Sequence, residues 1–179
     1  MSADCCRVLE EKIGVRAINS SDTKGALAEA GPYDVIALWH VVEHLPDPLE
    51  TLAAAAARLN PGGLLVVAAP NPSAFQFRVL GRYWTHVDAP RHVFLIPSEL
   101  LVERVRSLGL KPLLVTTTDE GGVGWNRFGW EQSLFNLTER ARPRHWLRRV
   151  GTKLTSMLDS VERQGMRGSA YTIVFQKES

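Results

Sequence analysis

The chain has 179 residues, of which 45% are hydrophobic and 22% charged, with a net charge of +2 and a mean hydropathy of -0.09. A chain of this length forms one domain with a real core, because roughly 70% of its unfolded surface becomes buried on folding. No stretch approaches the ~20 apolar residues that span a bilayer, which excludes an integral membrane protein. Residues Met1 to Arg7 lack the basic start and apolar run of a signal peptide, so we expect a cytoplasmic protein.

The first predicted elements alternate between helix and strand. Ala3 to Lys12 is predicted to be a helix that ends at Gly14. Val15 to Ile18 is predicted to be a short strand, and the polar turn after it leads into a small helix that ends near Gly31.

The clearest predicted strand is Tyr33 to Trp39, YDVIALW, which is almost wholly apolar, as expected for a central strand covered on both faces. A helix begins after it, because Asp47 can be the N-cap, Pro48 suits the first helical position and Glu50 is placed for a capping box. The second buried strand, Leu64 to Ala69, then completes a βαβ unit. The residues expected on the buried face of the helix are Leu49, Leu52, Ala53, Ala56 and Leu59.

The remaining elements continue the alternation. Residues Pro70 to Pro97 are predicted to be a long irregular stretch that serves a site, and Ser98 begins a helix that ends near Leu108. Lys111 to Thr118 and Ala170 to Gln176 are predicted strands on either side of an insertion. This order predicts an α/β fold with a mostly parallel sheet, in a single domain over residues 1–179.

The insertion, at about residues 121–168, is aromatic and basic. It is predicted to be helical from about Glu131, with a break near Pro143. The basic residues of the segment Arg140 to Arg149 either meet an anionic surface or form a solvated helix face. The aromatic residues indicate an apolar lid or acceptor pocket, or alternatively the packed core of an insertion helix: Trp125, Phe128, Trp130, Phe135 and Trp146.

Three segments in this order and spacing carry a family resemblance: YDVIALWHVVEHLPDP, LNPGGLLVVAAPNP and GRYWTHVDAPRHVFLIPSELLVERVRSLGL. Together they resemble the second half of class I S-adenosylmethionine-dependent methyltransferases, above all the bacterial group related to ubiquinone-biosynthesis O-methyltransferases. The resemblance covers roughly residues 3–119 and resumes in the final strand. It implies a Rossmann-like sheet, mostly parallel with a last antiparallel strand, that binds S-adenosylmethionine at the carboxyl ends of its strands.

The family's glycine-rich cofactor turn is not found in this sequence, which contains no GxGxG pattern. The nearest candidate, Gly121 to Gly124, follows a late strand and is better explained as a flexible turn. The resemblance places the helix from Ala3 after the family's second strand, so the first strand, its helix and the second strand are lacking. The strand Tyr33 to Trp39 then loses a neighbour, and its apolar edge predicts poor solubility, a homo-oligomer or a compensating rearrangement.

The cofactor contacts that the resemblance implies are Ser21, Asp22, Trp39 and His40. Ser21 stands where the family often has an aspartate that reaches the adenine amino group, and Asp22 is beside it. Trp39 and His40 follow a strand where family members contact the methionine part of the cofactor. Trp39 can equally be a core aromatic residue.

The segment His40 to His44, HVVEH, also matches a zinc-protease signature, H-x-x-E-H. The protease motif needs a helix to align its ligands, and Pro46 prevents a helix from continuing through this loop. We therefore reject that interpretation.

The resemblance implies a different metal site, because some family members place E-x-x-E-H in this loop, with a later histidine, around a divalent ion. His40 replaces the first glutamate here, so the implied ligands are Glu43, His44 and His92, with His40 as a fourth ligand and His86 as a spare. Such an ion would coordinate the acceptor hydroxyls, and the histidine would favour a softer ion than magnesium. The alternative is that Glu43 and His44 only brace the loop.

Methyl transfer needs positioning, together with a base where the acceptor must lose a proton. The candidates for that base are His86, Asp88 and His92, each of which can instead have a structural role. The leading hypothesis is an O-directed methyltransferase for a small-molecule or lipid-like acceptor. The competing hypotheses are a non-catalytic remnant that does not bind the cofactor, and a methyltransferase that acts on RNA, for which salt-dependent RNA binding would be the signature.

Overall fold

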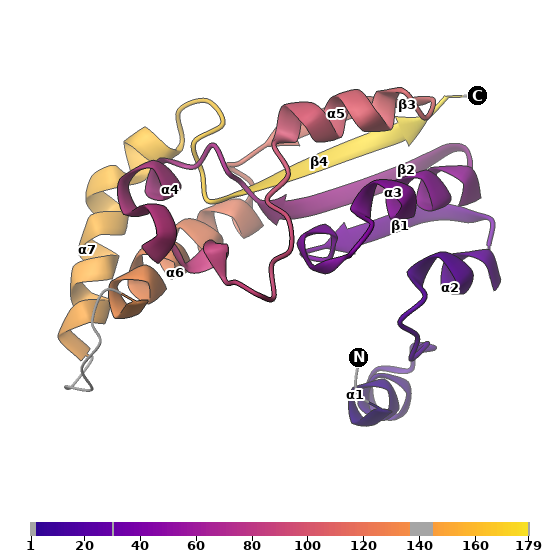
Figure 1. Cartoon of the computed structure of the whole chain (residues 1–179), viewed down its shortest axis with the longest axis horizontal. Helices are drawn as coiled ribbons and strands as arrows, with labels where there is room; N and C mark the ends of the chain where they lie inside the picture. Colours follow the sequence, from indigo (N-terminus) through magenta and orange to yellow (C-terminus); the bar gives the residue numbers. More distant parts are fainter. Residues whose placement is uncertain (1–2, 30, 137–144, 179) are drawn as a thin grey trace.

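The computed structural model describes residues 3–29, 31–136 and 145–178. A four-stranded sheet in the order β1-β2-β4-β3 is its centre (Figure 1). β4 is antiparallel to both of its neighbours, whereas β1 and β2 are parallel, so the first three strands point the same way and the last one runs against them. This confirms the predicted sheet, mostly parallel with a last antiparallel strand. The strands are β1 (Tyr33–Trp39), β2 (Leu59–Pro70), β3 (Leu110–Thr116) and β4 (Ala170–Lys177).

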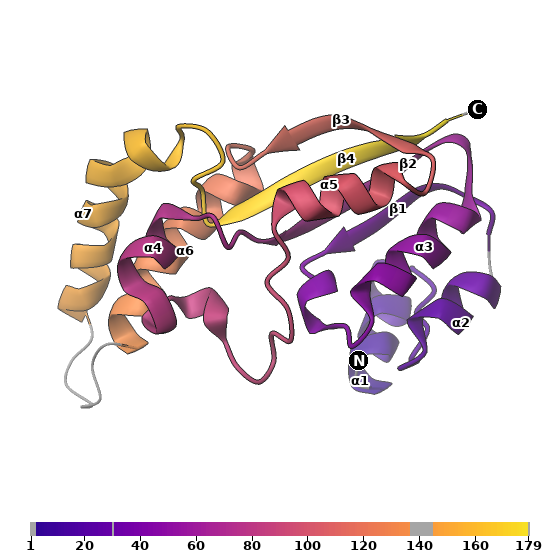
Figure 2. The same cartoon turned by 45° about the horizontal axis from the view of Figure 1, so that its top comes forward.

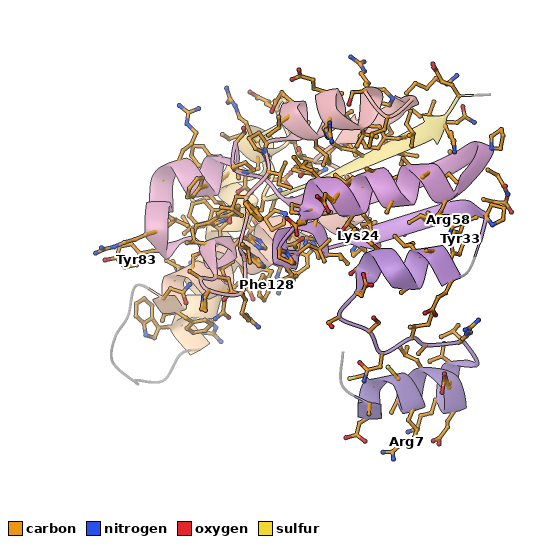
Figure 3. All side chains as sticks on the ribbon, turned by 45° about the vertical axis from the view of Figure 1, so that its right-hand side comes forward. Arg7, Lys24, Tyr33, Arg58, Tyr83 and Phe128 are labelled. Atoms are coloured by element: carbon orange, nitrogen blue, oxygen red, sulfur yellow. The ribbon has the colours of Figure 1, made fainter. Side chains whose placement is uncertain are left out.

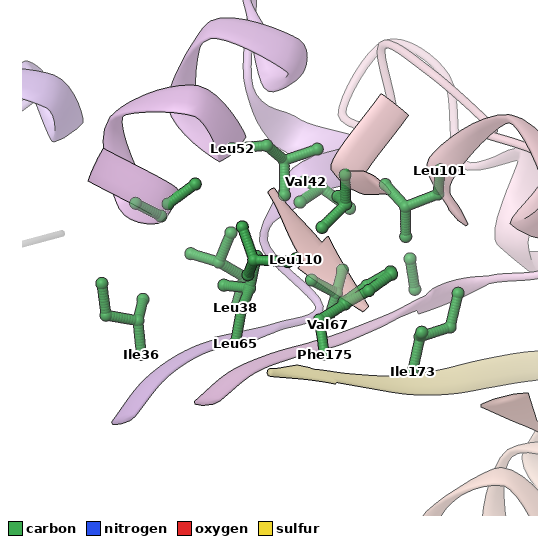
Figure 4. Close-up of a cluster of buried hydrophobic side chains, with 14 of the residues drawn as sticks. Ile36, Leu38, Val42, Leu52, Leu65, Val67, Leu101, Leu110, Ile173 and Phe175 are labelled. Atoms are coloured by element: carbon green, nitrogen blue, oxygen red, sulfur yellow. The ribbon is translucent and has the colours of Figure 1, made fainter. Parts of the chain in front are cut away.

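The hydrophobic core lies on one face of this sheet, beneath α3 (Pro48–Arg58) and α5 (Ser98–Arg106) (Figures 1 and 4). Leu52 of α3 and Leu101 of α5 are fully buried and point toward the strands. The strands present branched and aromatic side chains to them, since alternate residues of a strand share one face. These strand residues include Ile36, Leu38, Leu65, Val67, Ile173 and Phe175.

Helix α3 begins at Pro48, as predicted, because its missing N–H would have no partner in the first turn. The predicted capping box is wrong: the Asp47 side chain makes no cap hydrogen bond, and Glu50 instead forms an ion pair with Lys24 of α2 (Thr23–Glu29). Its buried face is also shifted, because Leu49 is 37% exposed and Ala55 is buried in its place.

The predicted strand Val15 to Ile18 is absent. An extended segment follows α1 (Ala3–Val8) and the π-helical turn η1 (Leu9–Ile13), and Val15 and Ile18 remain exposed. A strand needs a neighbour for its N–H and C=O groups, and none of the described strands lies beside this segment. Figure 3 shows this N-terminal part, with Arg7, apart from the rest of the chain.

The predicted irregular stretch after β2 contains short helices: α4 (Phe75–Leu80), η3 (Gly81–Tyr83) and η4 (Thr85–Val87). The insertion forms α6 (Glu120–Asn136) and α7 (His145–Glu162), so its helical part starts well before Glu131. The predicted break near Pro143 lies outside the described residues. Helices α4, α6 and α7 gather at one end of the molecule, toward which β1 and β2 point (Figures 1 and 2).

Strand β1 occupies an edge of the sheet, although its apolar sequence is typical of a central strand. Val35 is 56% exposed and Trp39 is 49% exposed, so the sheet face opposite α3 and α5 is partly uncovered. The open apolar edge that the resemblance implied for this strand is therefore present in the structure. None of the described helices is long and apolar enough to cross a membrane.

Candidate functional site

The loop that follows β1 is where the site begins. The backbone N–H of His40 donates to the Ala68 carbonyl at 2.9 Å, and His40 then adopts a positive φ of 51° that turns the chain away from the sheet. The next residues form the 3-10 turn η2 (Val42–His44). Because ligands of open α/β sheets bind beyond the carboxyl ends of the strands, this loop stands at the expected edge.

Glu43 brings a buried carboxyl group into this loop, with only 2% of the residue exposed. Its Oε1 lies 3.2 Å from Nδ1 of His40, and its Oε2 is buried with no hydrogen-bond partner among the described residues. The Glu43 carbonyl accepts a hydrogen bond from the N–H of Val93 at 2.8 Å, which fixes the loop against the segment that carries His92. A buried carboxylate oxygen without a partner is costly, so Oε2 is a candidate atom for contact with a ligand.

His44 and His92 are oriented by backbone carbonyls. Nδ1 of His44 lies 3.0 Å from the Arg91 carbonyl, and Nδ1 of His92 lies 2.7 Å from the His86 carbonyl. A carbonyl only accepts, so each Nδ1 must donate, which leaves each Nε2 with its lone pair in the neutral ring. The two rings are in edge contact at 4.7 Å, and Glu43, His44 and His92 offer ligand atoms that lie within 4.8 Å of one another.

These three residues therefore fit a divalent ion, with one carboxylate and two imidazoles as donors. The donor atoms, the buried Glu43 oxygen and the two oriented rings are the features that such a site requires. His40 is not among these three donors, and its Nδ1 contacts Glu43 instead.

His86 lies behind this cluster in an aromatic environment. It is 4% exposed, its Nε2 has no partner among the described residues, and burial, with smaller effects of His40 and His92, lowers its pKa to about 3. Its ring is therefore neutral near pH 7. The indole of Trp125 contacts the rings of both His40 and His86, at centroid distances of 4.5 and 5.3 Å.

Asp88 sits at a bend of the same segment, with a φ of 25°. Its carbonyl accepts hydrogen bonds from the N–H groups of Arg91 and His92 at 2.9 and 3.1 Å, and its carboxylate pairs with the Arg91 guanidinium at 2.5 Å. The Asp88 carboxylate is therefore engaged by a neighbouring guanidinium.

A cavity of about 710 Å³ joins all of these groups. Its polar side is built from the loop after β1 and the segment that follows η3, and its opposite wall comes from α6. Tyr83 and Phe128 both line this cavity, and Figure 3 shows them on the side of the molecule away from Arg7. The predicted base candidates and metal ligands thus converge, and the cavity is lined by His40, Glu43, His44, Arg82, Tyr83, Trp84, Thr85, His86, Val87, Asp88, Ala89, Arg91, His92, Trp125, Phe128, Gln132 and Asn136.

The other predicted cofactor contacts lie elsewhere. Ser21 and Asp22 stand in the exposed loop before α2, where the Asp22 carboxylate accepts a hydrogen bond from the N–H of Gly25 at 2.9 Å. Trp39 is half exposed, which excludes the alternative of a core aromatic residue, and it faces the start of α6 at Gly121. Of the four predicted cofactor contacts, only His40 lines the cavity.

Several lining residues were not predicted as site residues: Arg82, Tyr83, Gln132 and Asn136. The sequence feature that indicated this region was the run of aromatic residues around Trp125 and Phe128. Sequence alone did not show which of its aromatic residues face the cavity and which are core. Trp125 and Phe128 line the cavity, whereas Trp130 is buried against Glu162.

The fold is that of S-adenosylmethionine-dependent methyltransferases. The chain resembles the crystal structure of a SAM dependent methyltransferase from Archaeoglobus fulgidus, with a TM-score of 0.57 at 19% identity, over 96% of this chain and 72% of that one. Residues 3–115 match the family model described as a methyltransferase domain, and the chain belongs to that family.

Curated relatives share more sequence with the chain. It is 33% identical over 132 residues to the ubiquinone biosynthesis O-methyltransferase of Cereibacter sphaeroides (strain ATCC 17029 / ATH 2.4.9), over 69% of this chain and 51% of that protein. The enzyme of the same name from Ruegeria pomeroyi is 32% identical over 153 residues, which is 77% of this chain and 59% of the relative. The chain thus spans between half and three fifths of the length of these relatives.

Proposed function

We propose that this chain carries the acceptor side of an S-adenosylmethionine-dependent O-methyltransferase that acts on a small hydroxyl-bearing molecule in the cytoplasm. The observation that carries the proposal is the cavity at the carboxyl end of β1, where a buried carboxylate and four histidines meet an aromatic wall. The relatives are named as O-methyltransferases, which supports an oxygen acceptor.

In this proposal the cofactor supplies an activated methyl group bound to a sulfonium sulfur. The acceptor oxygen forms the new C–O bond as the S–CH3 bond breaks, and its proton passes to a base on this chain. The candidates for that base line the cavity: His86, whose buried Nε2 has no partner among the described residues, and Asp88, whose carboxylate pairs with Arg91. His92 could accept the proton only when it holds no ion, because its Nδ1 already faces the His86 carbonyl. Trp125 and Phe128 line the cavity, where their rings would shield the acceptor from water.

We also propose that Glu43, His44 and His92 hold a divalent ion. A bound ion would polarise an acceptor hydroxyl and favour its ionised form. Support comes from the three donors within 4.8 Å of one another and from the unpartnered Oε2 of Glu43.

Calorimetric titration of this chain with S-adenosylhomocysteine is the first test. We expect micromolar binding, followed by methyl transfer from labelled S-adenosylmethionine to hydroxyl-bearing acceptors. A folded sample that binds no S-adenosylhomocysteine would instead support the second candidate, a domain that does not use the cofactor. That candidate is favoured by one observation: the Asp22 carboxylate caps α2 rather than facing the cavity.

An RNA acceptor is a weaker proposal, because most of the basic segment on which it depends lies outside the described residues. Binding of a structured RNA that weakens steeply as salt rises would support it. An RNA affinity that does not change with the salt concentration would count against it, and so would the absence of RNA binding.

A further inference from the structure

We infer that the set Glu43, His44 and His92 selects a divalent first-row transition ion over magnesium, and that His40 is the positioning residue behind that preference. This inference rests on the metal site of the function proposed above. The observations behind it are the positions of Glu43, His44, His92 and His40, which all line the cavity.

The nitrogen donors are the first step. Nδ1 of both His44 and His92 is committed to a backbone carbonyl, at 3.0 and 2.7 Å, so their free donors are the Nε2 lone pairs. Magnesium prefers six oxygen ligands in near-octahedral geometry and accepts imidazole poorly. Two imidazoles with one carboxylate and open positions are typical of transition ions.

The second step is how His40 limits the oxygen donors. Its Nδ1 lies 3.2 Å from Oε1 of Glu43, so one carboxylate oxygen is engaged and the other, Oε2, is left to the ion. The Trp125 ring is tilted by 52° against the His40 ring, with 4.5 Å between their centroids, and the His40 side chain is only 15% exposed. The ring is thereby confined to its contact with Glu43.

The third step is the charge of the site. The three donor residues include a single carboxylate, that of Glu43. The other carboxylate that lines the cavity, Asp88, forms an ion pair with Arg91, so it is not a free oxygen donor. Fewer hard oxygen donors weaken magnesium more than they weaken an ion that imidazole binds well.

The test uses the full chain with metal alone, without cofactor or acceptor. Mn²⁺ and Mg²⁺ are titrated separately by calorimetry, with the depletion of the free Mn²⁺ paramagnetic resonance signal as a second readout. We expect one Mn²⁺ per chain, bound at least about tenfold more tightly than Mg²⁺. In His40→Glu the ratio of the two affinities should fall by roughly tenfold, because a second carboxylate is introduced. In His40→Gln, which keeps an N–H donor for Glu43, the preference for Mn²⁺ should be retained.

A matched pair of variants locates the site. Glu43→Gln should weaken Mn²⁺ binding by roughly 10- to 100-fold, whereas Glu50→Gln, which removes an exposed carboxylate paired with Lys24, should not change it. Circular dichroism of each variant establishes that it is folded before the titration is interpreted.

Equal affinities for Mn²⁺ and Mg²⁺ in the unmodified chain would overturn the inference, as would an unchanged ratio in folded His40→Glu or no binding of either ion. Binding of S-adenosylhomocysteine is measured separately. A chain that shows the expected metal preference but binds no S-adenosylhomocysteine would refute the cofactor proposal and leave the metal preference standing.

Discussion

Asn71 follows β2 and ties the end of the sheet to the segment before β4. It is fully buried, its Nδ2 donates to the carbonyls of Met166 and Gly168 at 2.9 Å each, and its Oδ1 accepts from the N–H of Ser73 at 3.0 Å. Burial without these bonds would leave three backbone groups unsatisfied. This side chain therefore has a structural role at the end of β2.

Replacing Asn71 by alanine should lower the free energy of unfolding by about 2–4 kcal/mol, because the buried carbonyls lose their donor without gaining water. Urea unfolding followed by circular dichroism measures this. Asn60→Ala is the control, since Asn60 makes one exposed hydrogen bond to Asp34 and should cost about 0.5 kcal/mol or less. Equal losses in the two variants would contradict the argument.

Helix α3 offers a comparison of buried and exposed leucines on one element. Leu52→Ala should cost about 2–5 kcal/mol, because Leu52 is fully buried in the core and its removal leaves a cavity. Leu49→Ala should cost less than about 1 kcal/mol, because Leu49 is 37% exposed. Denaturant unfolding of both variants checks the expectation, and a larger loss for Leu49 would mean that this face of α3 is covered in solution.

Helices α4, α6 and α7 are joined by a buried polar network centred on Glu162. Its Oε1 accepts hydrogen bonds from Gln76 at 2.8 Å and from Trp130 at 3.0 Å. Burial raises the pKa of Glu162 above its usual range, although these two hydrogen bonds act in the opposite direction. The network sets how the three helices pack at the end of the molecule where the cavity lies.

The raised pKa of Glu162 predicts a pH dependence of stability. In the folded state Glu162 keeps its proton to a higher pH than in the unfolded state, where its pKa is 4.5. The protonated side chain therefore contributes to the free energy of unfolding below pH 4.5, and this contribution is lost as the pH rises through the folded pKa. Glu162→Gln cannot ionise and should therefore lose less stability than the unmodified chain between about pH 5 and about pH 8. Thermal unfolding at both pH values measures the difference. The exposed Glu103→Gln should leave the pH profile unchanged, and a parallel profile for Glu162→Gln would sink the prediction.

The helices cover the two faces of the sheet to different extents. Helices α3 and α5 cover one face of the sheet. Strand β1 lies at an edge of the sheet, and its residues Val35 and Trp39 are exposed on the other face. An apolar open edge recruits another strand or another copy of the chain. We therefore expect the chain to self-associate through β1.

Val35→Lys should shift the chain toward the monomer, because a charge on the exposed face of an edge strand opposes pairing. Analytical ultracentrifugation over a range of concentrations measures the association. Leu113→Lys places the same charge on β3, at a residue that is 54% exposed, and should have little effect if β1 is the contact. A chain that is monomeric at every concentration would refute the expectation.

Much of the fold follows from local patterns. Tyr33–Trp39 and Ala170–Lys177 are strands with almost the predicted bounds, and α3 begins at Pro48, because apolar runs and a proline act over a few residues. The prediction of a strand at Val15 to Ile18 was wrong because a strand depends on more than its own sequence. The segment is extended, but none of the described strands lies beside it to pair with it.

The sequence by itself determined the α/β alternation, the family and the residue types that reach the candidate site, since these depend on periodicity and on motifs in register. Only the tertiary structure decided that His40 contacts Glu43, that two backbone carbonyls orient His44 and His92, and that Trp125 lines the cavity while Ser21 and Asp22 stay outside it. These contacts join residues far apart in the chain. Their geometry depends on how the loop after β1, the segment after η3 and α6 pack together, which no local pattern specifies.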